Sequence, residues 1–284
     1  MPETPAVNKS APAPRRIWVP WHSNWVPWRS GGYGIAMLVS VWIVWELVAA
    51  VSENPVFPSG FGVLWNVLLF LSEAKNYYHI QVTLIQIVIG FFLGTLAGVS
   101  VGVLLGAVRF LGRAIEPYIS ALSATPKIVF LPVALAIFGS GIASKAALAT
   151  LGSFFPIVLS TYVAMLSVRP IHVKVGCVFH LSPLKMATKI YLPSIARPIV
   201  VGMRIGLGVA VTTTLLAEVK MSKAGLGHML MEHYNHFRIE QMYAVLLVAL
   251  GFVAAGNTCM SLIIRKLSRG NTVRTGNSGN SGGF

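Results

Sequence analysis

Six apolar stretches, each close to the length needed to cross a lipid bilayer, constrain this chain more than any other feature. Hydrocarbon offers no partner to backbone polar groups, so a spanning segment must be a helix of about 20 residues that satisfies its own hydrogen bonds. The sequence therefore predicts an all-α integral membrane protein with six transmembrane helices. These helices cover roughly residues 33–52, 80–108, 114–138, 143–166, 194–219 and 242–264.

Charge is scarce and strongly basic. Only 11% of the residues are charged, none is Asp, and the formal net charge is +14. In a soluble chain this excess would favour nucleic acid, because clustered Lys and Arg release counterions from phosphates. Here the basic residues flank the apolar stretches, so we expect contact with membrane lipid and no nucleic-acid partner.

The distribution of basic residues predicts the orientation. With the N-terminus in the cytosol, 15 Lys and Arg residues fall in cytosolic segments and 5 in outer segments, as the positive-inside rule requires. Both termini are then cytosolic. We expect a tail at residues 1–32 with four tryptophans suited to a membrane interface, a transmembrane domain at 33–268 and a disordered tail at 269–284. The tryptophans are Trp18, Trp21, Trp25 and Trp28.

The second apolar stretch carries glycine at every fourth residue. This spacing places all five glycines on one slowly drifting face of a helix, where a neighbouring helix can approach closely. We predict that this face packs against another helix; the alternative is that glycine is simply common in membrane helices. The residues are Gly90, Gly94, Gly98, Gly102 and Gly106.

The third stretch contains Pro117, Pro126 and Pro132. Each proline removes a backbone donor, so this helix should be kinked or interrupted. Broken helices occur at membrane depth where they line a cavity or are buried in protein. The stretch is therefore a candidate wall of a translocation pathway.

The segment 167–193 is too basic for hydrocarbon. Val175, Val178 and Phe179 fall at helical spacing, Pro183 breaks the pattern, and a second helical pattern follows. We predict a cytosolic helix-turn-helix with an apolar stripe. Such a stripe either docks into another protein's groove or lies flat on anionic lipid.

The same segment resembles a known motif. The run KVGCVFHLSPLKMATKIYLP, residues 174–193, is similar to the cytoplasmic EAA loop of permease subunits of bacterial ABC importers. Ile190, Leu192 and Pro193 match the end of that motif. Residues 174–176 stand where Glu-Ala-Ala is usual, and His180 stands where Gly is usual.

The resemblance extends over about residues 33–268. The segments 57–68, 121–166, 202–219 and 225–227 resemble the nitrate, sulfonate and taurine branch of that family. The fold it implies is that of a type I ABC importer permease. The resemblance implies that the loop is a coupling helix that seats in a cleft of the ATPase subunit. The coupling residues are then Val175, Val178, Phe179, His180, Ile190, Leu192 and Pro193.

This resemblance implies a translocation subunit in a bacterial inner membrane, which carries a small and anionic solute such as nitrate, a sulfonate, taurine or an aromatic acid by alternating access. It implies a second permease subunit, which we expect to be a copy of this chain, two ATPase subunits and an external solute-binding protein. ATP and Mg²⁺ would be bound by the ATPase, and this chain would carry no cofactor. The competing reading is a secondary transporter or channel without ATPase subunits.

Two ionisable residues at membrane depth are pathway candidates, since such groups are costly in lipid. Lys127 follows Pro126 in the broken stretch and either holds an anion or snorkels towards the cytosol. Glu218 lies at the outer end of the fifth stretch and is either a gate or binding-protein contact or an interfacial cap. With Pro132, these residues form the predicted pathway set.

Enzymatic and metal chemistry have little support. The run GSGIASKA from Gly139 lacks the second glycine and the hydroxyl of a nucleotide-binding loop, so we expect ATP hydrolysis by a separate subunit. A membrane-embedded hydrolase would need paired acids or an activated nucleophile within the spans, and no such spacing occurs. Cys177 and Cys259 lack metal-ligand spacing. The cluster His228, His233 and His236 lies in an outer loop without the usual zinc spacing, so we expect no metal.

Overall fold

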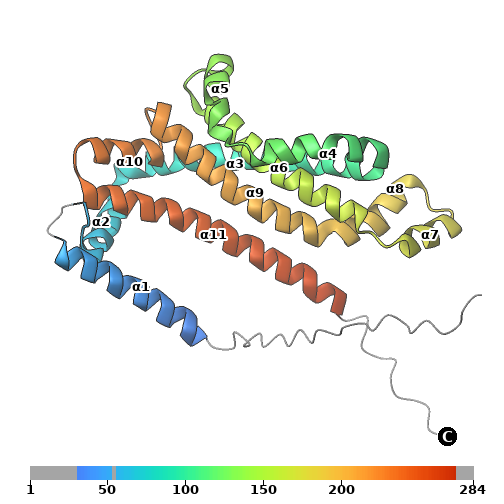
Figure 1. Ribbon diagram of the computed structural model, residues 1–284, viewed down its shortest axis with the longest axis horizontal. Helices are drawn as coiled ribbons and strands as arrows, with labels where there is room; N and C mark the ends of the chain where they lie inside the picture. Colours follow the sequence, from blue (N-terminus) through green and yellow to red (C-terminus); the bar gives the residue numbers. More distant parts are fainter. Residues whose placement is uncertain (1–30, 53–55, 273–284) are drawn as a thin grey trace, which may run out of the picture.

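The computed structural model describes residues 31–52 and 56–272, and these residues are helical without strands (Figure 1). The Trp-rich part of the predicted N-terminal tail lies outside the described residues. The elements are, in order, α1 (Gly31–Val51), α2 (Gly60–Ser72), α3 (Ala74–Ala107), α4 (Arg109–Ala124), the 3-10 turn η1 (Lys127–Phe130), α5 (Leu131–Phe138), α6 (Ile142–Leu166), α7 (Pro170–Val178), α8 (Pro183–Met186), the π-helical turn η2 (Ala187–Tyr191), α9 (Leu192–Met221), α10 (Leu226–Asn235) and α11 (Ile239–Thr272).

Four helices in the described part are long and apolar enough to cross a membrane. They are α3, α6, α9 with its preceding turn η2, and α11, and the pair formed by α4 and the η1–α5 segment counts as a fifth if taken as one bent span. The described side chains of α1 form a shorter apolar helix, Ala36–Val51. The prediction of an all-helical membrane protein is confirmed, whereas the predicted number of six spans is not established.

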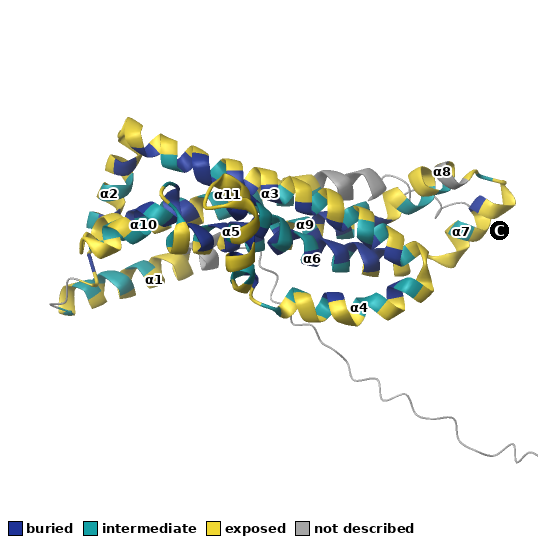
Figure 2. Ribbon diagram, turned by 90° about the horizontal axis from the view of Figure 1, so that it is seen from above, coloured by how far each residue is buried: buried dark blue, intermediate teal, exposed yellow. Residues whose placement is uncertain are grey.

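The centre of the bundle is formed by α3, α6 and α9. Figure 2 shows buried residues concentrated along α6 and α9, while α1 and α4 are largely exposed. One face of α3 packs in register against α6. Each step of four residues from one glycine of α3 to the next is matched by a step of four residues on α6. The facing residues are Ala149, Ser153, Ile157, Thr161 and Met165, opposite Gly90, Gly94, Gly98, Gly102 and Gly106.

Close approach explains why the stripe is built of glycine. A Cβ atom added at Gly102 would lie 2.6 Å from the Cβ of Thr161 and 2.8 Å from the carbonyl oxygen of Val158. Both distances are shorter than carbon contacts allow, so a side chain here would push the helices apart. Since the contacts repeat with the same four-residue step on both helices, α3 and α6 run parallel.

The third predicted span is broken, as its prolines indicate. The axes of α4 and the η1–α5 segment differ by 92°. The break lies at Pro126, which precedes η1, whereas Pro117 stays inside α4 and Pro132 lies in the first turn of α5. Pro132 is tolerated there because the first helical N–H groups have no intrahelical acceptor. Helix α5 therefore projects sideways from the bundle (Figure 1).

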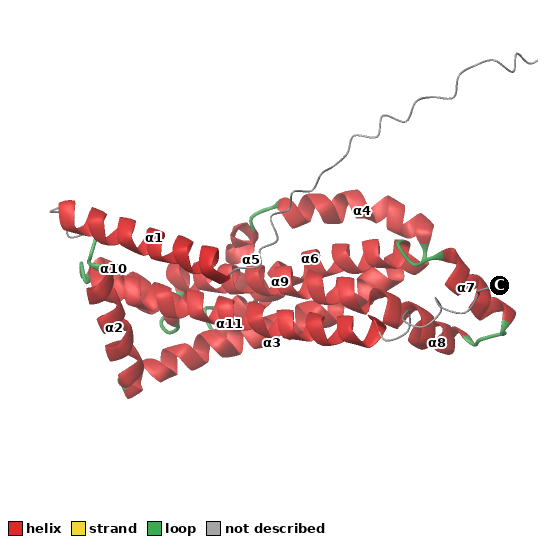
Figure 3. Ribbon diagram, turned by 90° about the horizontal axis from the view of Figure 1, so that it is seen from below, coloured by secondary structure: helices red, strands yellow, loops and turns green. Residues whose placement is uncertain are grey.

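The bundle has two contrasting ends. Helices α7 and α8 lie at one end, together with the α3–α4 junction, and α2 and α10 lie at the other (Figures 1 and 3). Seven of the 17 basic residues in the described part lie in or next to the first group of elements, namely Arg109, Arg113, Arg169, Lys174, Lys185, Lys189 and Arg197. The second group carries Lys75, Lys220, Lys223 and Arg238. This asymmetry is the one on which the predicted orientation rests.

Two features at the chain's flanks differ from or add to the expectation. Helix α11 continues to Thr272, beyond residue 269 where we expect the tail to begin.

Helix α2 is an additional short apolar helix. It begins at Ser59, whose hydroxyl accepts a hydrogen bond from the N–H of Gly62, and the carboxylate of Glu46 on α1 accepts from the N–H of Gly60 at 2.8 Å. Both bonds satisfy N–H groups that a helix start leaves free.

Candidate functional site

The segment predicted to be a cytosolic helix-turn-helix has that form. Helix α7 ends at Val178, and the chain resumes helical structure at Pro183 and enters α9 through η2. Val175, Val178 and Phe179 are exposed, and 73% of Phe179 is accessible. We call the segment 170–193 the coupling loop. Within it Ile171, Val175, Val178, Phe179 and Leu192 are apolar side chains exposed in the described part of the chain.

The turn between α7 and α8 depends on an unusual backbone angle. His180 has φ of 47°, which lies in the left-handed region that non-glycine residues rarely adopt. The N–H of His180 donates to the carbonyl of Cys177, and the N–H of Leu181 donates to that of Gly176, both at 3.0 Å. This pair of bonds is a Schellman cap. It explains why glycine is usual at this position of the EAA motif.

Met186 of α8 and Ile190 of η2 pack against α7 just before α9 begins. The Cδ1 atom of Ile190 and the sulfur of Met186 would each lie 2.6 Å from a Cβ added at Gly176, so these side chains fill the space beside the glycine. A groove of about 310 Å³ remains between α7 and the start of α9. It is lined by His172, Val175, Lys189, Ile190, Pro193 and Ser194. Leu192 lies outside it and is exposed.

Lys127 closes the bend. Its ammonium group donates to the carbonyls of Leu122, Ser123 and Thr125 at 2.9, 2.6 and 2.7 Å. These carbonyls lie at the end of α4, where a helix leaves acceptors unsatisfied. An ammonium group has three donors, and all three are used. The same group lies 5.3 Å from the ring centre of Phe155, which adds a cation–π contact.

A cavity of about 340 Å³ adjoins the bend. Pro126 and Lys127 line it from the broken span, and Gly208, Thr212 and Leu216 line it from α9. Thr212 is exposed there, while its hydroxyl donates to the carbonyl of Gly208. Pro132 does not line this cavity. The hollow between the broken span and α9 is therefore lined by both polar and apolar side chains.

Glu218, assigned to the pathway with Lys127, is buried in this chain, with 0% of its surface exposed. Its carboxylate accepts from the hydroxyl of Thr83 at 2.8 Å and from the N–H of Gly227 at 2.8 Å. The hydroxyl oxygen of Thr83 in turn accepts from the N–H of Leu226. These bonds join α3 and α9 to the first turn of α10. The structure thus places Glu218 at an internal junction.

Sequence reasoning missed Lys145, which we counted among outer-segment cations. Only 1% of this residue is exposed. Its ammonium group donates to the carbonyl of Met221 at 2.9 Å and to that of Ser140. Lys145 therefore closes the end of α9 as Lys127 closes the end of α4. The sequence signal for this carbonyl contact is the position of Lys145 in the first turn of an apolar helix that follows a glycine-rich turn.

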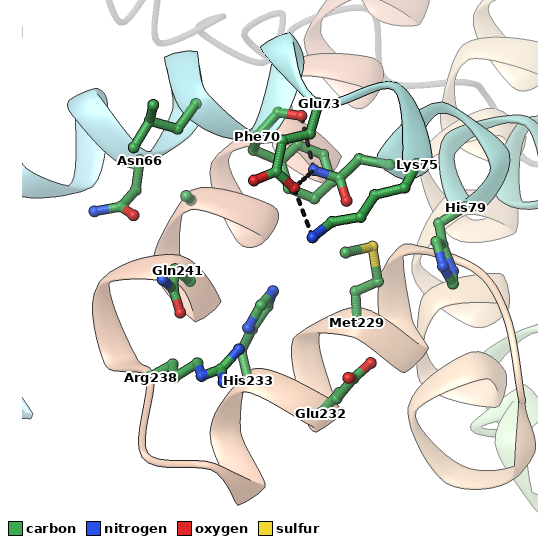
Figure 4. A pocket seen from close by; sticks show the side chains of 13 residues that line it. Asn66, Phe70, Glu73, Lys75, His79, Met229, Glu232, His233, Arg238 and Gln241 are labelled. Atoms are coloured by element: carbon green, nitrogen blue, oxygen red, sulfur yellow. Dashed lines mark hydrogen bonds and ion pairs between the residues drawn. The ribbon is translucent and has the colours of Figure 1, made fainter.

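The end opposite the coupling loop carries the pocket shown in Figure 4, with a volume of about 360 Å³. Asn76 and the ion pair of Glu73 with Lys75, 2.9 Å apart, line one side, and His233 and Arg238 line the other. The hydrogen bond from Lys75 lowers the pKa of Glu73. Burial lowers the pKa of His233, whose Nδ1 atom has no partner. The pocket holds both signs of charge, so its walls do not select an anion.

The histidine cluster does not assemble a metal site in the described part of the chain, where no group of three His, Cys, Asp or Glu side chains converges. His228 stacks on His79, with ring centres 6.2 Å apart, and lies 3.8 Å from Glu232. The Nδ1 atom of His79 accepts from the N–H of Gly225. These histidines therefore take part in packing α10 against α3.

Comparison with known proteins places these features in a family. Residues 86–273 match the family described as binding-protein-dependent transport system inner membrane component. This range includes the glycine stripe, the bend, the coupling loop and Glu218. It covers about two thirds of the chain.

Curated relatives and a solved structure agree with this match. The chain is 24% identical over 232 residues to a putative aliphatic sulfonates transport permease protein of Bacillus subtilis, covering 82% of this chain and 84% of that one. It is 28% identical over 201 residues to the taurine transport system permease protein of Escherichia coli, covering 69% and 72%. An inward facing structure of the methionine ABC transporter MetNI matches with a TM-score of 0.59 at 20% identity, covering 69% of this chain and 99% of that chain.

The resemblance inferred from the coupling loop is therefore confirmed, as is the fold class. The match to MetNI supports the fold alone, because the identity is low. The ATPase-coupling and pathway residues named above remain predictions.

Proposed function

Because this chain belongs to the family of binding-protein-dependent transport system inner membrane components, we propose that it is the translocation subunit of an ABC importer for a small solute that carries a sulfonate group, such as an aliphatic sulfonate or taurine. The chain is a transport subunit and no enzyme. ATP hydrolysis belongs to a separate ATPase, which binds ATP and Mg²⁺. The substrate class rests on the names of the sulfonate and taurine relatives.

One observation carries the proposal: the coupling loop projects from one end of the bundle with uncovered apolar side chains (Figure 1). Exposed Val175, Val178 and Phe179 lie on or next to the short helix α7, in which Gly176 packs against Ile190 of η2, the turn that leads directly into α9. A displacement of α7 would therefore act on the long helix α9. This is the connection that transmits ATPase closure to the membrane.

The working unit would pair two copies of this chain with two ATPase subunits and an external binding protein. By the positive-inside rule, the basic residues at the coupling-loop end support a cytosolic location for that end and for both termini. ATP-driven closure of the ATPases would draw the two coupling loops together and open the cavity outwards, and hydrolysis would reverse the change.

The pathway would pass the hollow beside Pro126, lined by α9 and the bend. Since the donors of Lys127 are used by α4, its contribution to anion passage would be long-range attraction in a site of low dielectric rather than a direct bond. Lys127→Met removes this attraction and also leaves three carbonyls unpaired. We expect lower transport together with a lower melting temperature. An unchanged melting temperature would show that these carbonyl contacts do not stabilise the bend.

The function is tested by reconstituting the chain with its ATPase and binding protein into proteoliposomes and measuring uptake of radiolabelled taurine. We expect uptake that requires ATP, the binding protein and the coupling loop. Uptake by this chain alone, driven by an ion gradient without ATPase, would instead establish a secondary transporter. An ATPase that copurifies with the chain is the simpler first observation.

A further inference from the structure

A cavity of about 380 Å³ lies between α4 and α6 at the coupling-loop end. Its lining consists of Arg109 and Arg113 from α4, and Tyr162 and Leu166 from α6. The two arginines are one helical turn apart, so their side chains lie on the same face of α4. Neither the predicted pathway nor the coupling loop includes this cavity.

The polar side chains that line the cavity offer hydrogen-bond donors, and most of these donors have no acceptor within the described residues. Within the described residues neither arginine forms an ion pair, and the only bond of their side chains is a long one of 3.4 Å from Nε of Arg113 to the carbonyl of Arg109. The nearest acid along α4, Glu116, accepts instead from the hydroxyl of Ser120 at 3.1 Å. Two guanidinium groups thus face the cavity with most of their donors free.

Packing holds Tyr162 in place at one side of this cavity. Only 6% of this residue is exposed, and its ring packs in the apolar cluster formed with Leu105, Ile119 and Phe155. Its hydroxyl has no hydrogen-bond partner in the described chain. A Cβ added at Gly112 would lie 2.6 Å from the ring and 3.2 Å from that hydroxyl oxygen, so a larger residue there would crowd the phenol. The hydroxyl is not among the fully buried polar atoms and lines the cavity, where its O–H can donate to a ligand.

We propose that Arg109, Arg113 and Tyr162 form a binding site for the phosphate group of an anionic phospholipid. A phosphodiester offers acceptor oxygens that match guanidinium forks and a phenolic O–H. Apolar side chains are exposed next to these residues: Leu166 in the lining itself, and Val108 and Phe110 on either side of Arg109 in the chain. A lipid would cover these side chains with its acyl chains, which a free anion cannot do. Basic pockets between membrane helices are known to bind lipid head groups in this manner.

The test measures lipid retention. The purified permease–ATPase complex is exchanged into mixed micelles of phosphatidylglycerol and phosphatidylcholine, and the lipids that remain bound are counted by native mass spectrometry. We expect the wild type to retain phosphatidylglycerol preferentially. The variant Arg109→Gln with Arg113→Gln should reduce this retention about 25-fold, because each basic residue near a lipid surface is worth about 1 kcal/mol, or about fivefold, and the two factors multiply.

Tyr162→Phe keeps the ring in the core and removes only the donor, so it should lower retention without unfolding the protein. Lys220→Gln with Lys223→Gln makes the same change in charge at exposed positions of the opposite end of the bundle and should leave retention unchanged. Equal retention in the wild type and in both cavity variants would overturn the proposal. Displacement of the lipid by inorganic phosphate or taurine at millimolar concentration would overturn the lipid assignment and indicate a site for a soluble anion.

Discussion

Helices α7 and α10 are short helices at opposite ends of the bundle, and they differ in how far the rest of the chain covers them. Both end in a Schellman cap with a non-glycine residue at positive φ, His180 at 47° and Phe237 at 56°. Each cap presents an exposed aromatic ring, Phe179 beside the first and Phe237 itself at the second. Their backbone construction is therefore nearly the same.

The difference lies in what holds each helix. The first turn of α10 is bound by Glu218 and Thr83, and Leu226 is fully buried beneath it. Helix α7 has one buried residue, Gly176, and the rest of its apolar surface is open. Helix α10 is thus completed within this chain, and the contrast supports the proposal that α7 is completed by another protein.

The largest effect is expected at the exposed ring of α7. Phe179→Asp would place a charge in the contact with the ATPase and cost about 3–5 kcal/mol of binding, because a desolvated unpaired charge is expensive. The complex should then purify without ATPase, while the melting temperature of the permease stays the same. Phe237→Asp is the matched control at the other cap and should retain ATPase. Equal retention in both variants would show that α7 does not dock.

The next effect is expected at Glu218. Glu218→Ala leaves the N–H of Gly227 and the hydroxyl of Thr83 without their acceptor, which should cost about 2–4 kcal/mol of stability. Hydrogen exchange at residues 225–235 should rise before that of the central helices. Glu232→Ala, on the exposed face of α10, is the control and should change little. Unchanged protection of α10 in Glu218→Ala would contradict the difference drawn between the two helices.

A smaller effect of opposite sign is expected at the caps. Glycine adopts positive φ without a steric penalty, so His180→Gly and Phe237→Gly should each stabilise the fold by about 0.5–1 kcal/mol. Thermal unfolding of both variants measures this gain. If His180→Gly gains stability and keeps its ATPase, His180 acts as a turn residue only; if it loses ATPase, the imidazole contacts the partner.

The smallest effect concerns pH at the α10 end. Burial holds the pKa of His233 below the ordinary value of 6.5, so the folded state binds its proton less readily than the unfolded state. Stability should therefore be unaffected above pH 6.5 and fall as the pH is lowered below it. Thermal unfolding between pH 5 and pH 8 should show a weaker dependence in His233→Asn. An identical dependence would assign the effect to other groups.

Much of the architecture could be predicted because lipid permits few solutions. Apolar length predicted the helices, proline predicted the break at Pro126, and the four-residue glycine repeat identified the face of α3 that meets α6. The positions of Val175, Val178 and Phe179 followed from helical spacing. These features are local, so a short window of sequence contains them.

The polar contacts could not be predicted, because they join residues far apart in the chain. Thr83 and Glu218 are 135 positions apart, and Lys145 and Met221 are 76 apart. From the sequence, Lys127 is predicted to hold an anion or to snorkel, and Lys145 is counted as an outer-segment cation. Both ammonium groups donate instead to backbone carbonyls, which no side-chain pattern reveals. The donor cavity beside Tyr162 likewise depends on how α4 approaches α6.

The π-helical turn η2 determines the direction in which the coupling loop faces. A π turn contains one residue more than an α turn, and the N–H of Leu192 accordingly bonds to the carbonyl of Ala187. Each residue of an α-helix advances the chain by about 100° around the axis. Deleting a single residue from Ala187–Tyr191 would therefore preserve nearly every side chain of α7 and yet rotate that helix to a different azimuth about α9. Loops of this kind are then interchangeable between permeases only when their angular phase, as well as their surface chemistry, is carried across.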